Sequence, residues 1–157
     1  MNSSSPFRNQ FQNGYIVRDL EKAQAVFSSR HGIRHWQVIR IPAGGPVVAI
    51  AKANVGNTMI ELIEAVPGQD TVYSRFIPES DEAARFHHFG YLVESADEFR
   101  EIGRAFRAEG VPIAFSGSHG DILDFFFADT VARLGHYCEF ILLKPAGKNF
   151  YADVPHN

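Results

Sequence analysis

The sequence predicts an α+β fold built from two βαβββ modules, and an internal repeat is the main reason. The segment Gln12-Asn13-Gly14-Tyr15-Ile16-Val17 aligns with His88-Phe89-Gly90-Tyr91-Leu92-Val93, about half a chain later. Such repeats are sought first because missing one leads to the wrong fold. An amphipathic helix pattern follows each copy, and each half closes with an apolar strand that contains one glutamate. The order strand, helix and three strands therefore occurs twice.

The first module is expected over residues 11–66. Alternating polarity predicts a strand over 11–17. A helix should begin after the N-cap Asp19 and end near residue 30 or 31, before Gly32, because aspartate caps helix starts and glycine follows helix ends. Short apolar runs punctuated by glycine and proline predict three further strands, over 34–41, 47–53 and 59–65.

A polar connector is expected over residues 67–85, with Pro67, Gly68 and Pro78 as its helix and strand breakers. A short helical or extended piece is expected around residues 73–76. Loops of this length are often lids or interface arms. The alternative is a simple span between the two modules, and the residues leave both interpretations open.

The second module is expected over residues 86–144, with a strand over 86–94 and a helix over 97–109. Phe99, Ile102 and Phe106 recur at helical spacing and predict one apolar stripe. Three more strands are expected over 111–115, 122–127 and 137–143, with a flexible turn over 116–120. Residues 1–10 should form a flexible tail, and residues 145–157 a tail without periodic pattern.

Composition narrows the classes of partner. The chain has 157 residues, a net charge of −3 and no long run of one sign, which argues against nucleic acid or an anionic membrane as a partner. No apolar run approaches the roughly 18 residues that span a bilayer, and the start of the chain does not resemble a signal peptide. A lone cysteine, Cys138, fits a reducing compartment. We therefore expect a cytoplasmic protein that binds neither nucleic acid nor a membrane.

Four polar residues occupy matched places in the two apolar modules: Gln12, Glu61, His88 and Glu139. Strand alternation puts them on the side opposite the helix-packing residues, while it turns His87 away. Buried charges need a partner or a metal. An imidazole, two carboxylates and an amide oxygen suit a divalent ion such as Zn, Ni, Co, Mn or Fe. Taken singly, His88 could be a hydrogen-bonded core histidine, and either glutamate could pair with an arginine.

These residues resemble the vicinal oxygen chelate superfamily, which includes glyoxalase I, extradiol dioxygenases and bleomycin-resistance proteins. The resemblance covers about residues 11–144, and it lies in the segments 14–23, 86–90 and 129–140. It implies a cupped, mostly antiparallel sheet around a metal, and a homodimer. The family's ligand positions fall on Gln12, Glu61, His88 and Glu139, a set similar to that of one class of glyoxalase I.

The resemblance implies a metal-dependent lyase or isomerase of the glyoxalase type. It would chelate a carbonyl or hydroxy substrate and transfer a proton through an enediolate, with Glu139 as first choice of base and Glu61 as second. Three alternatives stay open: an epimerase, which the segment Ser74-Arg75-Phe76-Ile77 resembles, an iron-dependent dioxygenase, and a non-catalytic binding protein. Gln12 argues against the dioxygenase, because that class presents a histidine there.

Overall fold

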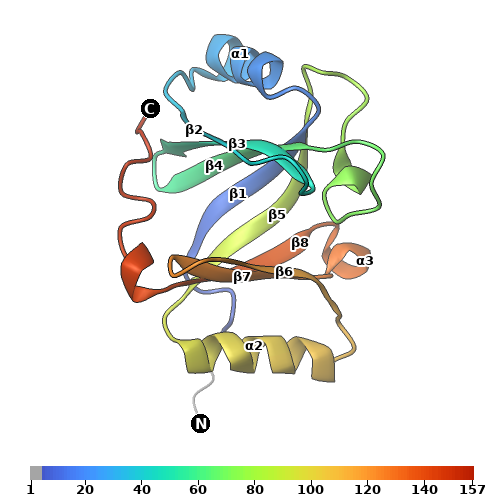
Figure 1. The fold of residues 1–157 in the computed structure, drawn as a ribbon, viewed down its shortest axis with the longest axis vertical. Helices are drawn as coiled ribbons and strands as arrows, with labels where there is room; N and C mark the ends of the chain where they lie inside the picture. Colours follow the sequence, from blue (N-terminus) through green and yellow to red (C-terminus); the bar gives the residue numbers. More distant parts are fainter. Residues whose placement is uncertain (1–4) are drawn as a thin grey trace. The chain divides into compact units, whose positions relative to one another are not determined.

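Two units of similar construction make up the chain in the computed structural model, which describes residues 5–157 (Figure 1). We call residues 12–87 with 153–157 the first unit, and residues 5–11 with 88–152 the second unit. Each unit therefore combines one long segment with one short segment. The short segment of the first unit comes from the C-terminal end of the chain, and that of the second unit from the N-terminal end.

The first unit is a four-stranded sheet with one helix against it. Its strands follow the order β2-β3-β4-β1, in which β1 and β4 are parallel and the other pairs antiparallel. The elements are β1 (Gln10–Val17), α1 (Leu20–His31), β2 (Gln37–Arg40), β3 (Val47–Val55) and β4 (Thr58–Ala65). Leu20 and Ala23 of α1 pack on Val17, Ala51 and Leu62 of the sheet. One face of α1 therefore packs against one face of the sheet.

The caps of α1 are those expected from sequence. The Asp19 carboxylate accepts a hydrogen bond from the backbone N–H of Lys22 at 3.0 Å. Gly32 closes the helix with a φ of 74°. Only glycine adopts this left-handed conformation at no steric cost, so both ends of α1 are fixed by local sequence.

The second unit repeats this plan, with strand order β5-β8-β7-β6 and β5 parallel to β8. Its elements are β5 (Ala84–Val93), α2 (Ala96–Ala108), β6 (Ile113–His119), β7 (Leu123–Ala128), α3 (Val131–Leu134), β8 (Tyr137–Leu143) and a short 3₁₀ turn, η2 (Pro145–Gly147). α2 lies along one face of the β6–β7 hairpin (Figure 1). An aromatic core fills the space beneath it, and the fully buried Phe140 contacts Tyr91, Phe106 and Phe126.

Segments from the two ends of the chain complete the units. In the second unit, Phe7 packs on Tyr91 and Arg8 pairs with Glu98 at 2.8 Å. In the first unit, the Asn157 side chain accepts hydrogen bonds from the backbone N–H groups of Arg34 and His35. Residues 1–4 of the expected tail lie outside the described part of the chain.

The connector folds back on His87 within the first unit. It contains the short 3₁₀ helix η1 (Ser74–Phe76), which confirms the helical piece expected around residues 73–76. The His87 ring is fully buried, stacks on Tyr73 at 5.5 Å and meets Phe76 edge-on at 4.9 Å. Its Nε2–H donates to the carbonyl of Val72 at 3.0 Å. His87 therefore has a structural role, as strand alternation predicts.

We expect the substitution His87→Leu to loosen the connector selectively. The change removes the ring stacking and the bond to the Val72 carbonyl, and an unsatisfied buried carbonyl costs about 1–3 kcal/mol. Hydrogen exchange should rise over residues 70–77, and trypsin should cut faster after Arg75. The matched change at the exposed His35 should leave both rates unaltered, and equal protection in the two variants would contradict this role for His87.

Two local predictions are wrong, and one helix was not predicted. Residues 116–119 continue strand β6 rather than forming a turn, because they pair with β7 in register up to His119 opposite Leu123. The second strand is shorter than expected and begins at Gln37, since Trp36 instead packs against Phe27 of α1. The helix α3 was not expected. Among residues 5–157, none of the helices has the length and apolar character needed to cross a membrane.

Candidate functional site

His88 and Glu139 face each other on the neighbouring parallel strands β5 and β8 of the second unit. Nε2 of His88 lies 3.0 Å from Oε2 of Glu139. The histidine is fully buried and the glutamate is 8% exposed. Within the described residues, no hydrogen bond of ordinary geometry reaches Oε2 of Glu139. Nitrogen and oxygen ligands bound at about 2.1 Å to one cation lie about 3 Å apart when they are at right angles, so the pair fits two ligands of a shared ion.

Aromatic packing holds this pair in a dry environment. Phe127 of β7, which is 1% exposed, meets the His88 ring edge-on at 5.1 Å. It also lies opposite Glu139 in the pairing of β7 with β8. The adjacent Cys138 belongs to the helix-facing core, where burial raises the pKa of its thiol. Strand alternation thus separates the polar side of β8 from its apolar side.

Gln12 and Glu61 form a second pair on parallel strands β1 and β4 of the first unit. Gly14 lies opposite Glu61 in register. Gln12, two residues earlier, therefore shares the face of Glu61. Both side chains are buried, with exposed fractions of 1% and 7%. Each unit thus contains two buried residues of ligand type, one on its first strand and one on its last strand.

Lys52 is a feature of this face that sequence reasoning missed. It lies on β3 directly opposite Glu61 and is only 4% exposed. Its Nζ is 3.9 Å from Oε1 of Glu61, a loose ion pair. Fully buried lysines are rare unless they are paired. The available signal was one charge inside the small apolar run Val47–Val55.

Three of the predicted ligands, Glu61, His88 and Glu139, are buried and each offers one ligand atom of a kind that binds metal ions. Gln12 adds an amide oxygen. Two of the remaining histidines of the second unit have other surroundings. His136 contacts the Tyr137 carbonyl through Nδ1 at 2.8 Å, and His119 is exposed. The donor chemistry of the four predicted residues therefore fits a divalent cation, and the surroundings of these two histidines do not.

Comparisons with known proteins agree with this architecture. A family model described as the glyoxalase/bleomycin resistance protein/dioxygenase superfamily matches residues 11–127. None of the curated proteins matches the sequence.

Several solved structures share the fold at low sequence identity. A Streptomyces coelicolor methylmalonyl-CoA epimerase in complex with 2-nitronate-propionyl-CoA has 15% identity and a TM-score of 0.62, over 86% of this chain and 96% of that one. The Mycobacterium tuberculosis methylmalonyl-CoA epimerase has 16% identity and a TM-score of 0.62, over 93% and 95% of the two chains. A hypothetical protein from Bacillus halodurans C-125 has 17% identity and a TM-score of 0.62, over 86% and 94%.

These likenesses confirm the predicted α+β fold of paired βαβββ modules. The match of the family model over most of the sequence establishes membership. The chain belongs to the glyoxalase/bleomycin resistance protein/dioxygenase superfamily.

Proposed function

We propose that this protein is a metal-dependent lyase or isomerase of the glyoxalase type, which transfers a proton next to a carbonyl group through an enediolate. The observation that carries the proposal is the buried contact of His88 with Glu139, at 3.0 Å and without a hydrogen bond of ordinary geometry to the carboxylate oxygen. Burying a carboxylate beside a neutral imidazole is costly, and a cation held by both groups would offset that cost. Membership of the superfamily and the epimerase fold support isomerase-type chemistry.

We propose that Gln12, Glu61, His88 and Glu139 together hold one divalent cation. The set contains no thiolate, so it suits Zn, Ni, Co, Mn or Fe as a borderline to hard ion. The bound ion would supply Lewis-acid polarisation of a substrate oxygen. The repeat of one buried pair in each unit supports a shared site.

In this proposal Glu139 is the base that takes the proton from the carbon next to the carbonyl. Glu61 is the second candidate, or the acid that returns the proton. Phe127 packs edge-on against the His88 side of the pair. The two glutamates would thus divide removal and return of the proton between the two units.

Lys52 supports a negatively charged substrate. Two carboxylates balance a divalent cation, so the buried ammonium 3.9 Å from Glu61 adds a positive charge. An enediolate, or a substrate with its own carboxylate, would compensate it. The related epimerases are named for a coenzyme A thioester whose acyl group carries a carboxylate. We therefore propose small carbonyl compounds with a second anionic group as the substrate class.

Elemental analysis of protein purified without added metal tests the site. We expect about one divalent ion per chain and its loss in His88→Ala, while the matched His119→Ala retains it. A ligand that binds only the native state stabilises it. A chelator should therefore lower the melting temperature of the wild type and of His119→Ala, and should leave that of His88→Ala unchanged. If His88→Ala altered neither metal content nor stability, the assignment of the ligands would be wrong.

A second candidate function, non-catalytic binding of a small molecule, is favoured by the ion pair of Lys52 with Glu61. That pair, together with a protonated His88 beside Glu139, would balance the buried charges without a metal. Native protein that contains no metal would support this second function.

Two assays separate the enzyme reactions. Deuterium exchange at the α-carbon of methylmalonyl-CoA reports epimerase chemistry, and oxygen uptake with Fe(II) reports a dioxygenase.

Cytoplasmic location and assembly as a homodimer also belong to this proposal. The lone cysteine, buried and reduced, fits a reducing compartment. Both statements remain predictions from the sequence and its family resemblance.

A further inference from the structure

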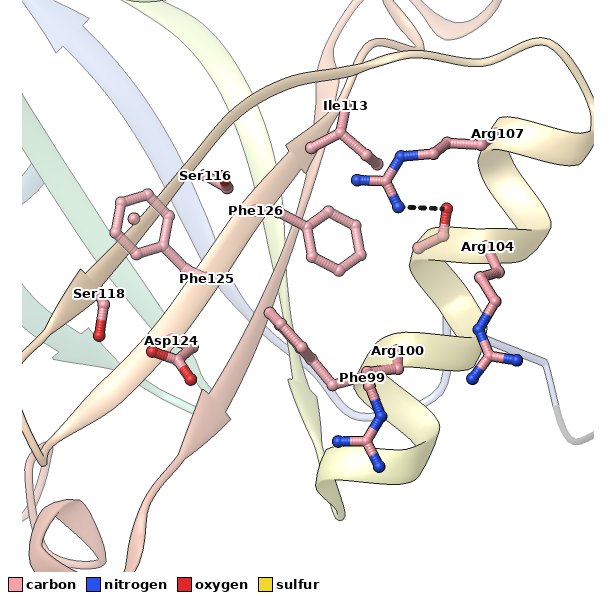
Figure 2. A pocket seen from close by; sticks show the side chains of 12 residues that line it. Phe99, Arg100, Arg104, Arg107, Ile113, Ser116, Ser118, Asp124, Phe125 and Phe126 are labelled. Carbon is pink, nitrogen blue, oxygen red and sulfur yellow. Dashed lines mark hydrogen bonds between the residues drawn. The ribbon is translucent and has the colours of Figure 1, made fainter.

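A cavity lies in the second unit, between α2 and the β6–β7 hairpin (Figure 2). Its volume is about 670 Å³, within the range of small-molecule sites. Phe126 lines it and packs on Phe99 of α2, whereas the next residue, Phe127, points to His88. Phe126 therefore lines the cavity on the face of β7 opposite the proposed metal ligand His88.

Three arginines form the helix wall of this cavity. Arg100, Arg104 and Arg107 are spaced by four and then three residues, so they follow one stripe along α2. Figure 2 shows Arg107 reaching from α2 toward Ile113 and Phe126, with the other two along the same helix. Guanidinium groups match phosphate and carboxylate geometry with paired hydrogen bonds, so this wall suits an anion.

Arg107 supplies the charge that local pairs do not offset. Arg100 pairs with Asp97, and Arg104 with Glu101 at 3.3 Å, as exposed pairs one helical turn apart. Exposed pairs of this kind contribute only about 0–1 kcal/mol, so a phosphate can displace them. Among residues 5–157, no carboxylate lies within ion-pair distance of Arg107, whose Nη1 donates a long hydrogen bond of 3.4 Å to the Gly103 carbonyl.

Among the described residues, the one carboxylate that lines the cavity is that of Asp124, which is already paired with a cation and so does not repel an anion. Asp124 is bound by the Lys144 ammonium at 2.7 Å. That bond and a hydrogen bond from Ser118 lower the pKa of the Asp124 carboxyl. Lys144 therefore neutralises Asp124, and the arginine wall sets the sign of the local field.

Gly103 opens the apolar side of the cavity. Glycine in mid-helix costs about 1 kcal/mol relative to alanine, yet a Cβ here would meet only the Arg107 Nη1 at 3.4 Å and the Phe126 ring at 3.7 Å. Backbone crowding thus does not require this glycine. The missing side chain leaves the edges of Phe99 and Phe126 accessible beside the guanidinium groups.

We propose that this cavity binds a small organic phosphate. The phosphate group would bind Arg104 and Arg107, and the apolar body would lie along Phe99 and Phe126. This site is independent of the metal-dependent activity proposed above. A free phosphate ion shares the charge but not the apolar body, so it should bind more weakly.

NMR titration of the native protein with phenyl phosphate, inorganic phosphate and phenol tests the site. We expect phenyl phosphate to bind most tightly, with shifts confined to residues 99–107 and 113–126, and phenol not to bind. Arg107→Gln should weaken phenyl phosphate at least tenfold. The matched Arg133→Gln, on exposed α3 of the same unit, should not weaken it. Higher salt should weaken binding, because exposed charges are screened.

Any of three results would overturn the proposal. The first is a failure of phenyl phosphate to bind at millimolar concentration, the second is an equal fall of its affinity in Arg107→Gln and Arg133→Gln, and the third is a spread of its chemical-shift changes over the whole surface. Selective binding of an acidic peptide in place of phenyl phosphate would also overturn it and assign the face to a protein partner. Thermal melts of both variants should match the wild type, because both side chains are exposed.

Discussion

Glu139→Gln is expected to abolish proton exchange on a carbonyl substrate while the fold stays intact. Glutamine has nearly the shape of glutamate and keeps an oxygen beside His88, but it cannot accept the proton. General base catalysis contributes about 10²- to 10⁴-fold, so exchange should fall by at least that factor. The measurement is the loss of the α-proton signal in deuterium oxide, on a substrate that the wild type exchanges.

Metal content must be measured on the same samples, because Glu139 is also a proposed ligand. With metal added to wild-type occupancy, the exchange defect should persist. The matched control is Glu109→Gln at the exposed end of α2, which should exchange at the wild-type rate. A Glu139→Gln enzyme with full activity would exclude this residue as the base, and a larger defect in Glu61→Gln would reverse the two roles.

Phe140→Ala is expected to be the most destabilising single change in the second unit. The ring is fully buried and contacts Tyr91 at 5.3 Å, Phe126 at 5.2 Å and Phe106 at 5.5 Å. Removing such a ring leaves a cavity and costs about 3–5 kcal/mol. Total stabilities are only about 5–15 kcal/mol. At roughly 2–4 °C per kcal/mol for this size, the melting temperature should fall by about 10 °C.

Urea denaturation with a fluorescence or circular-dichroism readout gives the free energy of unfolding directly. Leu134→Ala, at a position 53% exposed, is the control and should change stability by less than about 0.5 kcal/mol. The loss of stability in Phe140→Leu should lie between those of Phe140→Ala and Leu134→Ala, because leucine refills part of the space. A loss below about 1 kcal/mol for Phe140→Ala would mean that the aromatic core repacks freely, contrary to dense packing.

The repeat and the strand faces made most of the fold predictable. The Asp19 cap, the Gly32 end of α1 and the bounds of β8 depend on local signals, and the structure has them where the sequence places them. Alternation predicts only that His88 and Glu139 lie on the side away from the helices, because a period of two fixes which side of a strand each residue occupies.

The features that the sequence did not predict depend on contacts between residues far apart in the chain. Ser116 and Gly117 have turn composition, yet pairing with Phe126 and Phe125 extends β6 through them. The inward position of Lys52 is set by its register against Glu61. A charge in a short apolar run does not reveal whether it faces solvent or a buried carboxylate. Tertiary pairing overrides local propensity in both cases.

The ends of the chain have a consequence for how the protein is made. Residues 12–87 leave the ribosome before residues 153–157, which belong to the same unit. Chains grow at about 5–20 residues per second, so the early half must wait several seconds for the hydrogen bonds that Asn157 makes with Arg34 and His35. A nascent chain should therefore complete its first unit only once residues 153–157 have emerged, and a chain split between residues 87 and 88 would yield two fragments that each lack a piece of their own unit.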